Sequence, residues 1–153
     1  MKKQQLLDKL EQAWTDFVQS HAGLSDEQLT RPGVTDGWSV KDILAHVTTW
    51  EEEALKYLPL ILRGEKLPRY KDLYGGIDAF NAQMTAKKQA LPLSDILSQL
   101  DDTHRRLIGF IQSVPDDQIA TETPFRRRLR LDTYSHYPIH ASAIRSWREH
   151  IIV

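Results

Sequence analysis

The packing of the last predicted helix is decided by the stretch Asp132-Thr-Tyr-Ser-His136-Tyr-Pro-Ile-His140-Ala-Ser-Ala-Ile-Arg-Ser-Trp147. Two histidines four positions apart on a helix differ by only about 40° in direction, so both imidazoles leave from one side, one turn apart. The residues that continue this side are all apolar: Ala143, Ile144, Trp147 and Ile151. Both histidines are therefore expected to point into a protein interior.

Pro138 lies between the two histidines and limits where this helix can begin. A proline in a helix interior costs ~3 kcal/mol or more, but the first turn tolerates it because its missing N–H has no partner there. Capping by Thr133 or Ser135 would place Pro138 in that turn. We expect the helix over about 133–151.

A second long helix is predicted over about 39–64. Ser39 is a good N-cap and Asp42 follows three positions later, as in a capping box. Pro59 removes one hydrogen bond and predicts a kink or an early end. Apolar residues recur at helical spacing: Val40, Ile43, Leu44, Val47, Trp50, Ala54, Tyr57, Leu58 and Ile61.

The remaining periodic segments complete an all-α architecture. Helices are predicted at 2–21, 76–90 and 94–113, with Ser94 as the cap of the last, whereas 65–75 and 116–131 are predicted to be loops. The long connection from 64 to 94 indicates a crossover. We therefore expect a single domain over 1–153: a four-helix bundle with a crossover connection and one extra shorter helix.

Composition excludes several classes of function. The chain has 153 residues, a formal net charge of −1 and no cysteine, so disulfides, cysteine metal sites and cysteine nucleophiles are excluded. The near-zero charge argues against nucleic acid and membrane partners. No secretion signal or membrane span is evident, which predicts a cytoplasmic protein.

A metal site needs a third ligand, and His46 is the best candidate. Its neighbours at −3, +1 and +4 are all apolar, so it also faces the interior. Three histidines from two helices would leave coordination positions open, as in a catalytic metal site. His104 is a rival ligand, and the alternative for each is a core histidine hydrogen-bonded to a neighbour. His21 and His150 lie at helix ends and are expected at the surface.

The chain resembles the DinB/YfiT-like superfamily of metal-binding four-helix bundles. The resemblance covers nearly the whole chain and rests on Gly37-Trp-Ser-Val-Lys-Asp-Ile-Leu-Ala-His46-Val-Thr-Thr-Trp50 and, some 90 residues later, on His136-x-x-x-His140-x-x-x-Ile144-Arg-x-Trp147. The middle part, with Gly76-Ile-Asp-Ala-Phe-Asn81, is more loosely similar to the ClbS/DfsB branch. The resemblance implies that His46, His136 and His140 bind a divalent metal, nickel or zinc.

The resemblance also implies candidate activities on a small-molecule substrate. One is a metal-dependent hydrolase or thiol-dependent S-transferase, with a low-molecular-weight thiol as co-substrate because the chain has no cysteine. An alternative is a non-catalytic binding or self-resistance protein of ClbS type, since ClbS itself lacks the full histidine set. A third is a structural homodimer with packed histidines, whose interface would be sought first at Trp14, Phe17 and Tyr57.

Two carboxylates and one basic run remain to be assigned. Asp42 and Glu53, at −4 and +7 from His46, are candidates for acid–base catalysis, with solvated helix-face carboxylates as the alternative. The run Arg126-Arg-Arg-Leu-Arg130 is expected to be a solvated loop that flanks the mouth of the metal site and attracts an acidic substrate.

Overall fold

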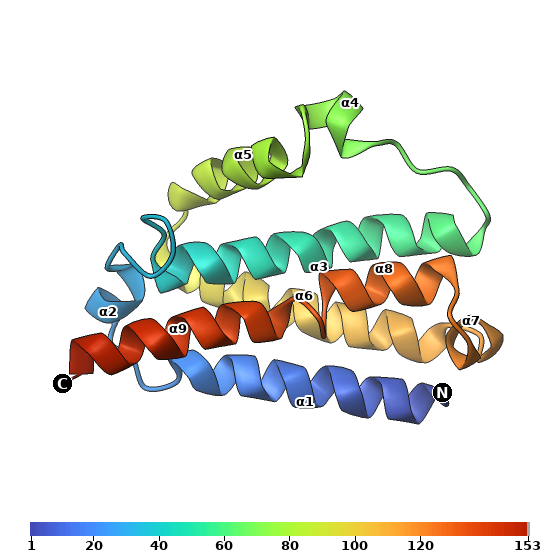
Figure 1. Ribbon diagram of the computed structural model, residues 1–153, viewed down its shortest axis with the longest axis horizontal. Helices are drawn as coiled ribbons and strands as arrows, with labels where there is room; N and C mark the ends of the chain where they lie inside the picture. Colours follow the sequence, from blue (N-terminus) through green and yellow to red (C-terminus); the bar gives the residue numbers. More distant parts are fainter. Residues whose placement is uncertain (153) are drawn as a thin grey trace.

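Four long helices form the bundle in the computed structural model, which describes residues 1–152 (Figure 1). α1 packs along α9, and α3 packs along α6. No β-strand occurs in residues 1–152, so the prediction of an all-α four-helix bundle is confirmed. The long helices are α1 (Lys3–His21), α3 (Val40–Leu62), α6 (Leu93–Ser113) and α9 (Tyr137–Ile152).

The expected extra shorter helix is present as α5, and four further short helices are described in residues 1–152. Two of the shorter helices, α4 and α5, belong to the predicted crossover, which leads from the end of α3 to the start of α6 and lies beside α3 in Figure 1. The shorter helices are α2 (Asp26–Thr30), α4 (Tyr70–Tyr74), α5 (Ile77–Gln89), α7 (Asp117–Ala120) and α8 (Pro124–Asp132).

α8 replaces part of the predicted loop at 116–131. Its start is well specified, because the Thr123 side chain accepts a hydrogen bond from the backbone N–H of Arg126 and Pro124 occupies the first turn. Phe125 and Leu129, one turn apart, are fully buried and hold the helix against the bundle. α8 packs on α3 and is followed by α9 (Figure 1).

α3 begins as predicted and continues past its proline. The Ser39 side chain accepts from the Asp42 N–H, and the Asp42 carboxylate accepts from the Ser39 N–H, which completes the capping box. The helix runs to Leu62, so it does not end at Pro59. α6 differs from expectation, because Pro92 and not Ser94 is its N-cap residue.

Apolar side chains from all four long helices meet in one core. Two of the residues suggested for a dimer interface, Phe17 and Tyr57, are buried, and Trp14 is half-buried and packs against the core from α1. That suggestion is therefore wrong for Phe17 and Tyr57. Among the described residues, no helix has the length and apolar character required to cross a membrane.

Candidate metal centre and its cavity

The three predicted histidines reach one point from two parts of the chain. His46 lies on α3, and His140 lies in the first turn of α9. His136 precedes α9 in a turn where its backbone N–H donates to the carbonyl of Thr133 at 2.8 Å. Thr133 has φ −129° and ψ −100°, which ends α8 and redirects the chain. Pro138 falls in the first turn of α9, as predicted.

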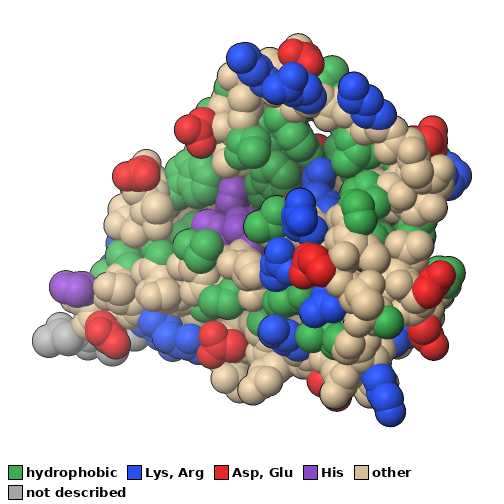
Figure 2. All heavy atoms as spheres, turned by 45° about the vertical axis from the view of Figure 1, so that its right-hand side comes forward, with side chains coloured by type: hydrophobic (Ala, Val, Ile, Leu, Met, Phe, Trp, Pro, Cys, Tyr) green, Lys and Arg blue, Asp and Glu red, His purple; other side chains and the backbone are tan. Residues whose placement is uncertain are grey.

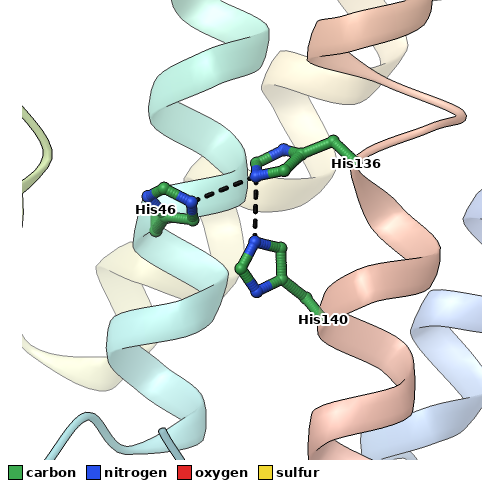
Figure 3. Close-up of side chains that lie close together, drawn as sticks. All are labelled: His46, His136 and His140. Atoms are coloured by element: carbon green, nitrogen blue, oxygen red, sulfur yellow. Dashed lines mark hydrogen bonds between the residues drawn. The ribbon is translucent and has the colours of Figure 1, made fainter. Parts of the chain in front are cut away.

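The Nε2 atoms of the three imidazoles converge (Figure 3). His136 Nε2 lies 3.1 Å from His46 Nε2 and 2.9 Å from His140 Nε2. One ring nitrogen from each histidine lies within 4.8 Å of the others. Each imidazole nitrogen offers one proton or one lone pair, so His136 Nε2 cannot make good hydrogen bonds to both neighbours at once. A metal ion would satisfy all three nitrogens together.

The alternative of ordinary core histidines describes this cluster poorly. Buried polar atoms of a packed core are normally hydrogen-bonded. The Nδ1 atoms of His46 and His136 are buried, and neither has a hydrogen-bond partner within the described part of the chain. The imidazoles are therefore oriented toward each other and not toward other protein groups.

Burial also keeps the three imidazoles neutral. Burial, helped by the charge of neighbouring histidines, lowers the pKa of His46 and His136 to about 3, and burial lowers that of His140 to about 4. At neutral pH all three rings present a lone pair, which is the form that binds a metal. The donor set therefore fits a divalent transition metal.

Trp38 covers His46 from the loop before α3. The ring centroids of the two side chains are 5.1 Å apart. The loop turns back through Asp36 and Gly37, both with positive φ, so that Thr35 and Trp38 pair as an isolated bridge. The turn thereby places an aromatic ring beside the histidines.

His104, the rival ligand, lies in a different cluster. Its Nδ1 is 2.8 Å from a carboxylate oxygen of Glu51, and its Nε2 is 2.7 Å from one of Glu11. Trp14 stacks on its ring with centroids 3.7 Å apart. Both ring nitrogens are occupied, so His104 is not free to join the histidine cluster as a ligand.

A cavity of about 510 Å³ opens beside the histidines, a size suited to a small organic molecule. In Figure 2 the histidine side chains lie at the base of a hollow bordered by hydrophobic side chains, with Lys and Arg side chains along one side. The cavity is lined by His46, Trp50, Tyr70, Ile77, Asn81, Arg128, Leu131, Asp132 and His136.

Asp132 and Arg128 are functional candidates that the sequence analysis missed. Arg128 Nε donates to Asp132 Oδ2 at 2.7 Å. Burial raises the pKa of Asp132 to about 6, although the charge of Arg128 opposes this effect. A carboxyl group with this pKa can exchange a proton near neutral pH. The available signal was spacing, because Asp132 and Arg128 precede His136 by four and eight residues.

The two predicted acid–base residues have other partners. Asp42 caps α3, and Glu53 accepts a hydrogen bond from the Tyr70 hydroxyl at 3.0 Å. Neither is among the described residues that line the cavity. Both are buried, so they are not solvated helix-face carboxylates either.

The arginine run forms part of a helix and not the predicted solvated loop. Arg128 turns inward to the cavity, and Arg130 donates to both carboxylate oxygens of Glu122. Arg126 donates to the carbonyl of Ile119 at 3.4 Å. The expectation that this segment flanks the mouth of the site is met through Arg128 alone.

Comparison with known proteins places the fold. A family model described as the DinB superfamily matches residues 9–141. No curated protein sequence matches the chain.

Several solved structures share the fold at low identity. The chain is similar to "Sibling Lethal Factor Precursor - DfsB" (TM-score 0.82, 17% identity, covering 98% of this chain and 96% of that one). It is also similar to an uncharacterised protein from Escherichia coli UTI89 (TM-score 0.80, 14% identity, covering 99% of this chain and 95% of that one). A third similar structure is the colibactin self-resistance protein ClbS in complex with a dsDNA (TM-score 0.78, 13% identity, covering 95% of this chain and 94% of that one).

The expectation that nucleic acid is not a partner is wrong. It rested on the net charge, but ClbS, which has the same fold, is in complex with a dsDNA. The physical reason is that a chain's net charge does not report where its charges lie. In this chain α8 alone carries Arg126, Arg127, Arg128 and Arg130.

Proposed function

The chain belongs to the DinB superfamily, and we propose that it is a metal-dependent enzyme acting on a small reactive molecule. The observation that carries the proposal is the convergence of three neutral, otherwise unpartnered imidazole nitrogens at the base of a cavity. Imidazole ligands suit nickel and zinc, and a set of three leaves positions open toward a substrate. His46, His136 and His140 would hold the ion.

The ion, when bound, supplies Lewis acidity that lowers the pKa of water or of a thiol and polarises a substrate carbonyl. The protein supplies the rest. The cavity walls hold the substrate beside the histidines. Asp132 can accept or donate a proton at its carboxylate, and Arg128 orients that carboxylate through the 2.7 Å hydrogen bond. This set serves a hydrolase or a thiol S-transferase, and in the second case the sulfur arrives with a small thiol because the chain has no cysteine.

Metal analysis of purified protein tests the proposal. We expect about one nickel or zinc ion per chain for the wild type, and loss of that ion in His140→Ala. His150→Ala is the matched control, because His150 is an exposed histidine on the same helix whose ring bonds only to the carbonyl of Ser146. Equal metal content in His140→Ala and His150→Ala would contradict the proposal.

A second candidate function is a self-resistance protein that binds a small toxic molecule without metal chemistry. The name of one similar structure, the colibactin self-resistance protein ClbS, favours it. It predicts ligand binding that persists in the double variant His136→Ala/His140→Ala. The enzyme proposal predicts that this double variant loses turnover while the cavity remains.

A further inference from the structure

Asn81 presents a hydrogen-bond donor at the cavity wall. Its side-chain oxygen accepts from the indole Nε1 of Trp50 at 2.9 Å. An indole N–H can only donate, so this contact fixes which end of the amide faces Trp50. The Asn81 NH₂ group has no hydrogen-bond partner within residues 1–152 and is left for a ligand.

Arg128 presents a second donor to the same cavity. Its Nε bonds to Asp132, and one terminal nitrogen, Nη2, donates to the Tyr70 hydroxyl at 2.8 Å. The other terminal nitrogen, Nη1, makes no hydrogen bond with the described residues. The guanidinium carbon lies 5.3 to 6.0 Å from the ring centroids of Trp50, Tyr57 and Tyr70, which hold the charged group in place.

Another part of the cavity lining is apolar. Ile77 on α5 and Leu131 on α8 both line it, yet they remain 54% and 59% exposed. Large apolar side chains left open at a cavity mouth mark a place where a ligand is covered. Trp50, whose indole N–H bonds to Asn81, adds a further aromatic side chain to the cavity lining.

We propose that this cavity binds a carboxylate-bearing molecule with an aromatic or alkyl body. Its carboxylate accepts hydrogen bonds from Arg128 Nη1 and the Asn81 amide, and its body packs against Trp50, Ile77 and Leu131. The inference rests on the proposed function for one point only, namely that the bound molecule is the substrate of the histidine site. The binding itself requires no metal.

The open hydrogen-bond donors of the cavity favour an anion over a cation, although Asp132 balances the charge of Arg128. Arg128 is always protonated, whereas one oxygen of its partner Asp132 is already bonded to it. An incoming ammonium group would face the guanidinium and the donor end of Asn81. A carboxylate instead meets two donors, one of them charged, and charge-assisted hydrogen bonds are the stronger kind.

The test compares 3-phenylpropanoate with its primary amide, 3-phenylpropanamide, by titration calorimetry on the full chain. Zinc-loaded and chelator-treated samples are both titrated. We expect the acid to bind at least tenfold more tightly than the amide in both samples. Binding of neither probe, or equal binding of both, would overturn the inference.

Asn81→Asp is the decisive variant. It retains a side-chain oxygen to accept from Trp50 but replaces the donor by a negative charge, so affinity for the acid should fall at least tenfold while affinity for the amide changes less than threefold. Leu131→Ala is the matched control, because it removes apolar contact only and should weaken both probes by the same factor. Unchanged acid binding in Asn81→Asp would refute the assignment.

Arg128 is tested as a pair with its partner. Arg128→Gln/Asp132→Asn removes both charges together, so no unpaired charge is left buried, and it should abolish the preference for the acid. Thermal melts of each variant identify any loss of folding. If the double variant does not fold, the result for Asn81→Asp alone decides whether the proposal stands. Acid binding that disappears on chelation and persists in Asn81→Asp would assign recognition to the metal and overturn the proposal.

The two proposals fail separately. Metal content is measured on the same samples. Bound metal without a preference for the acid would leave the enzyme proposal standing and remove this inference. A preference for the acid in a protein that takes up no metal would leave this inference standing and remove the enzyme proposal.

Discussion

At the residue scale, hydrogen-bond partners and not burial distinguish the three clustered histidines from His104, because His46 and His104 are both buried. His46, His136 and His140 are neutral and face one another, whereas His104 lies between two carboxylates that raise its pKa although burial alone would lower it. Histidine side chains in this bundle thus occur in two environments, one that lowers their pKa and one that raises it. The difference follows from the partners that the four long helices bring to each ring.

His21 shows that position at a helix end does not ensure exposure. It was expected at the surface, but its ring packs edge-on against Phe17 with centroids 5.4 Å apart, and its Nε2 is buried. Burial, assisted by the charge of Arg148, lowers its pKa to about 4. Sequence position alone could not show this, because α9 covers the end of α1.

The low pKa of His21 predicts a loss of stability in acid. The folded-state pKa lies below the unfolded value of 6.5, so the stabilisation is present above pH 6.5 and is lost as pH falls from 6.5 toward 4. In His21→Gln the unfolding free energy should fall less over this range, by roughly 1–3 kcal/mol. Urea denaturation at pH 7 and pH 4.5 measures it, with exposed His150→Gln as the control. Identical pH dependence in wild type and His21→Gln would contradict the account.

At the element scale, a chain of hydrogen bonds joins the four long helices. Glu11 of α1, Glu51 of α3, His104 of α6 and Tyr137 of α9 are linked by contacts of 2.7 to 2.8 Å. Glu51 is fully buried, so it depends on these donors. Tyr137 follows His136 directly, and its hydrogen bond to Glu51 therefore also holds the start of α9 beside the three clustered histidines.

Removing the Tyr137 hydroxyl should destabilise the bundle. Tyr137→Phe takes one donor from the buried Glu51 carboxylate, which we expect to cost about 1–3 kcal/mol of unfolding free energy. Tyr74→Phe is the control, since the Tyr74 hydroxyl makes no hydrogen bond within the described residues. Chemical denaturation at pH 7 compares the two variants. A Tyr137→Phe protein as stable as Tyr74→Phe would show that the hydrogen bond from Tyr137 to Glu51 does not stabilise the bundle.

The start of α3 offers a second test at this scale. Ser39→Ala removes the side-chain oxygen that caps the Asp42 N–H and should cost about 1 kcal/mol of unfolding free energy. Ser94→Ala provides the contrast, because Ser94 lies inside α6 and is not its cap. Its effect should stay within about 0.5 kcal/mol. Thermal melts of both variants measure this, and a reversed order would contradict the assigned helix starts.

At the scale of the whole molecule, the bundle and its histidines were predictable and the cavity was not. Apolar periodicity identified the four long helices, and the apolar neighbours of His46 and His140 pointed both inward. α8 was missed because four arginines in nine residues mask an inner face that has few apolar positions. Asn81 and Arg128 line one cavity only after α5 and α8 pack on α3, and such non-local packing leaves no periodic signal.

X-ray absorption spectroscopy of the zinc- or nickel-loaded protein tests the central claim most directly. If His46, His136 and His140 hold the ion, the spectrum should contain three imidazole nitrogens at about 2.0–2.1 Å, and His140→Ala should lose one of them or the metal altogether. An ion with fewer than three imidazole ligands, or a spectrum unchanged in His140→Ala, would contradict the account.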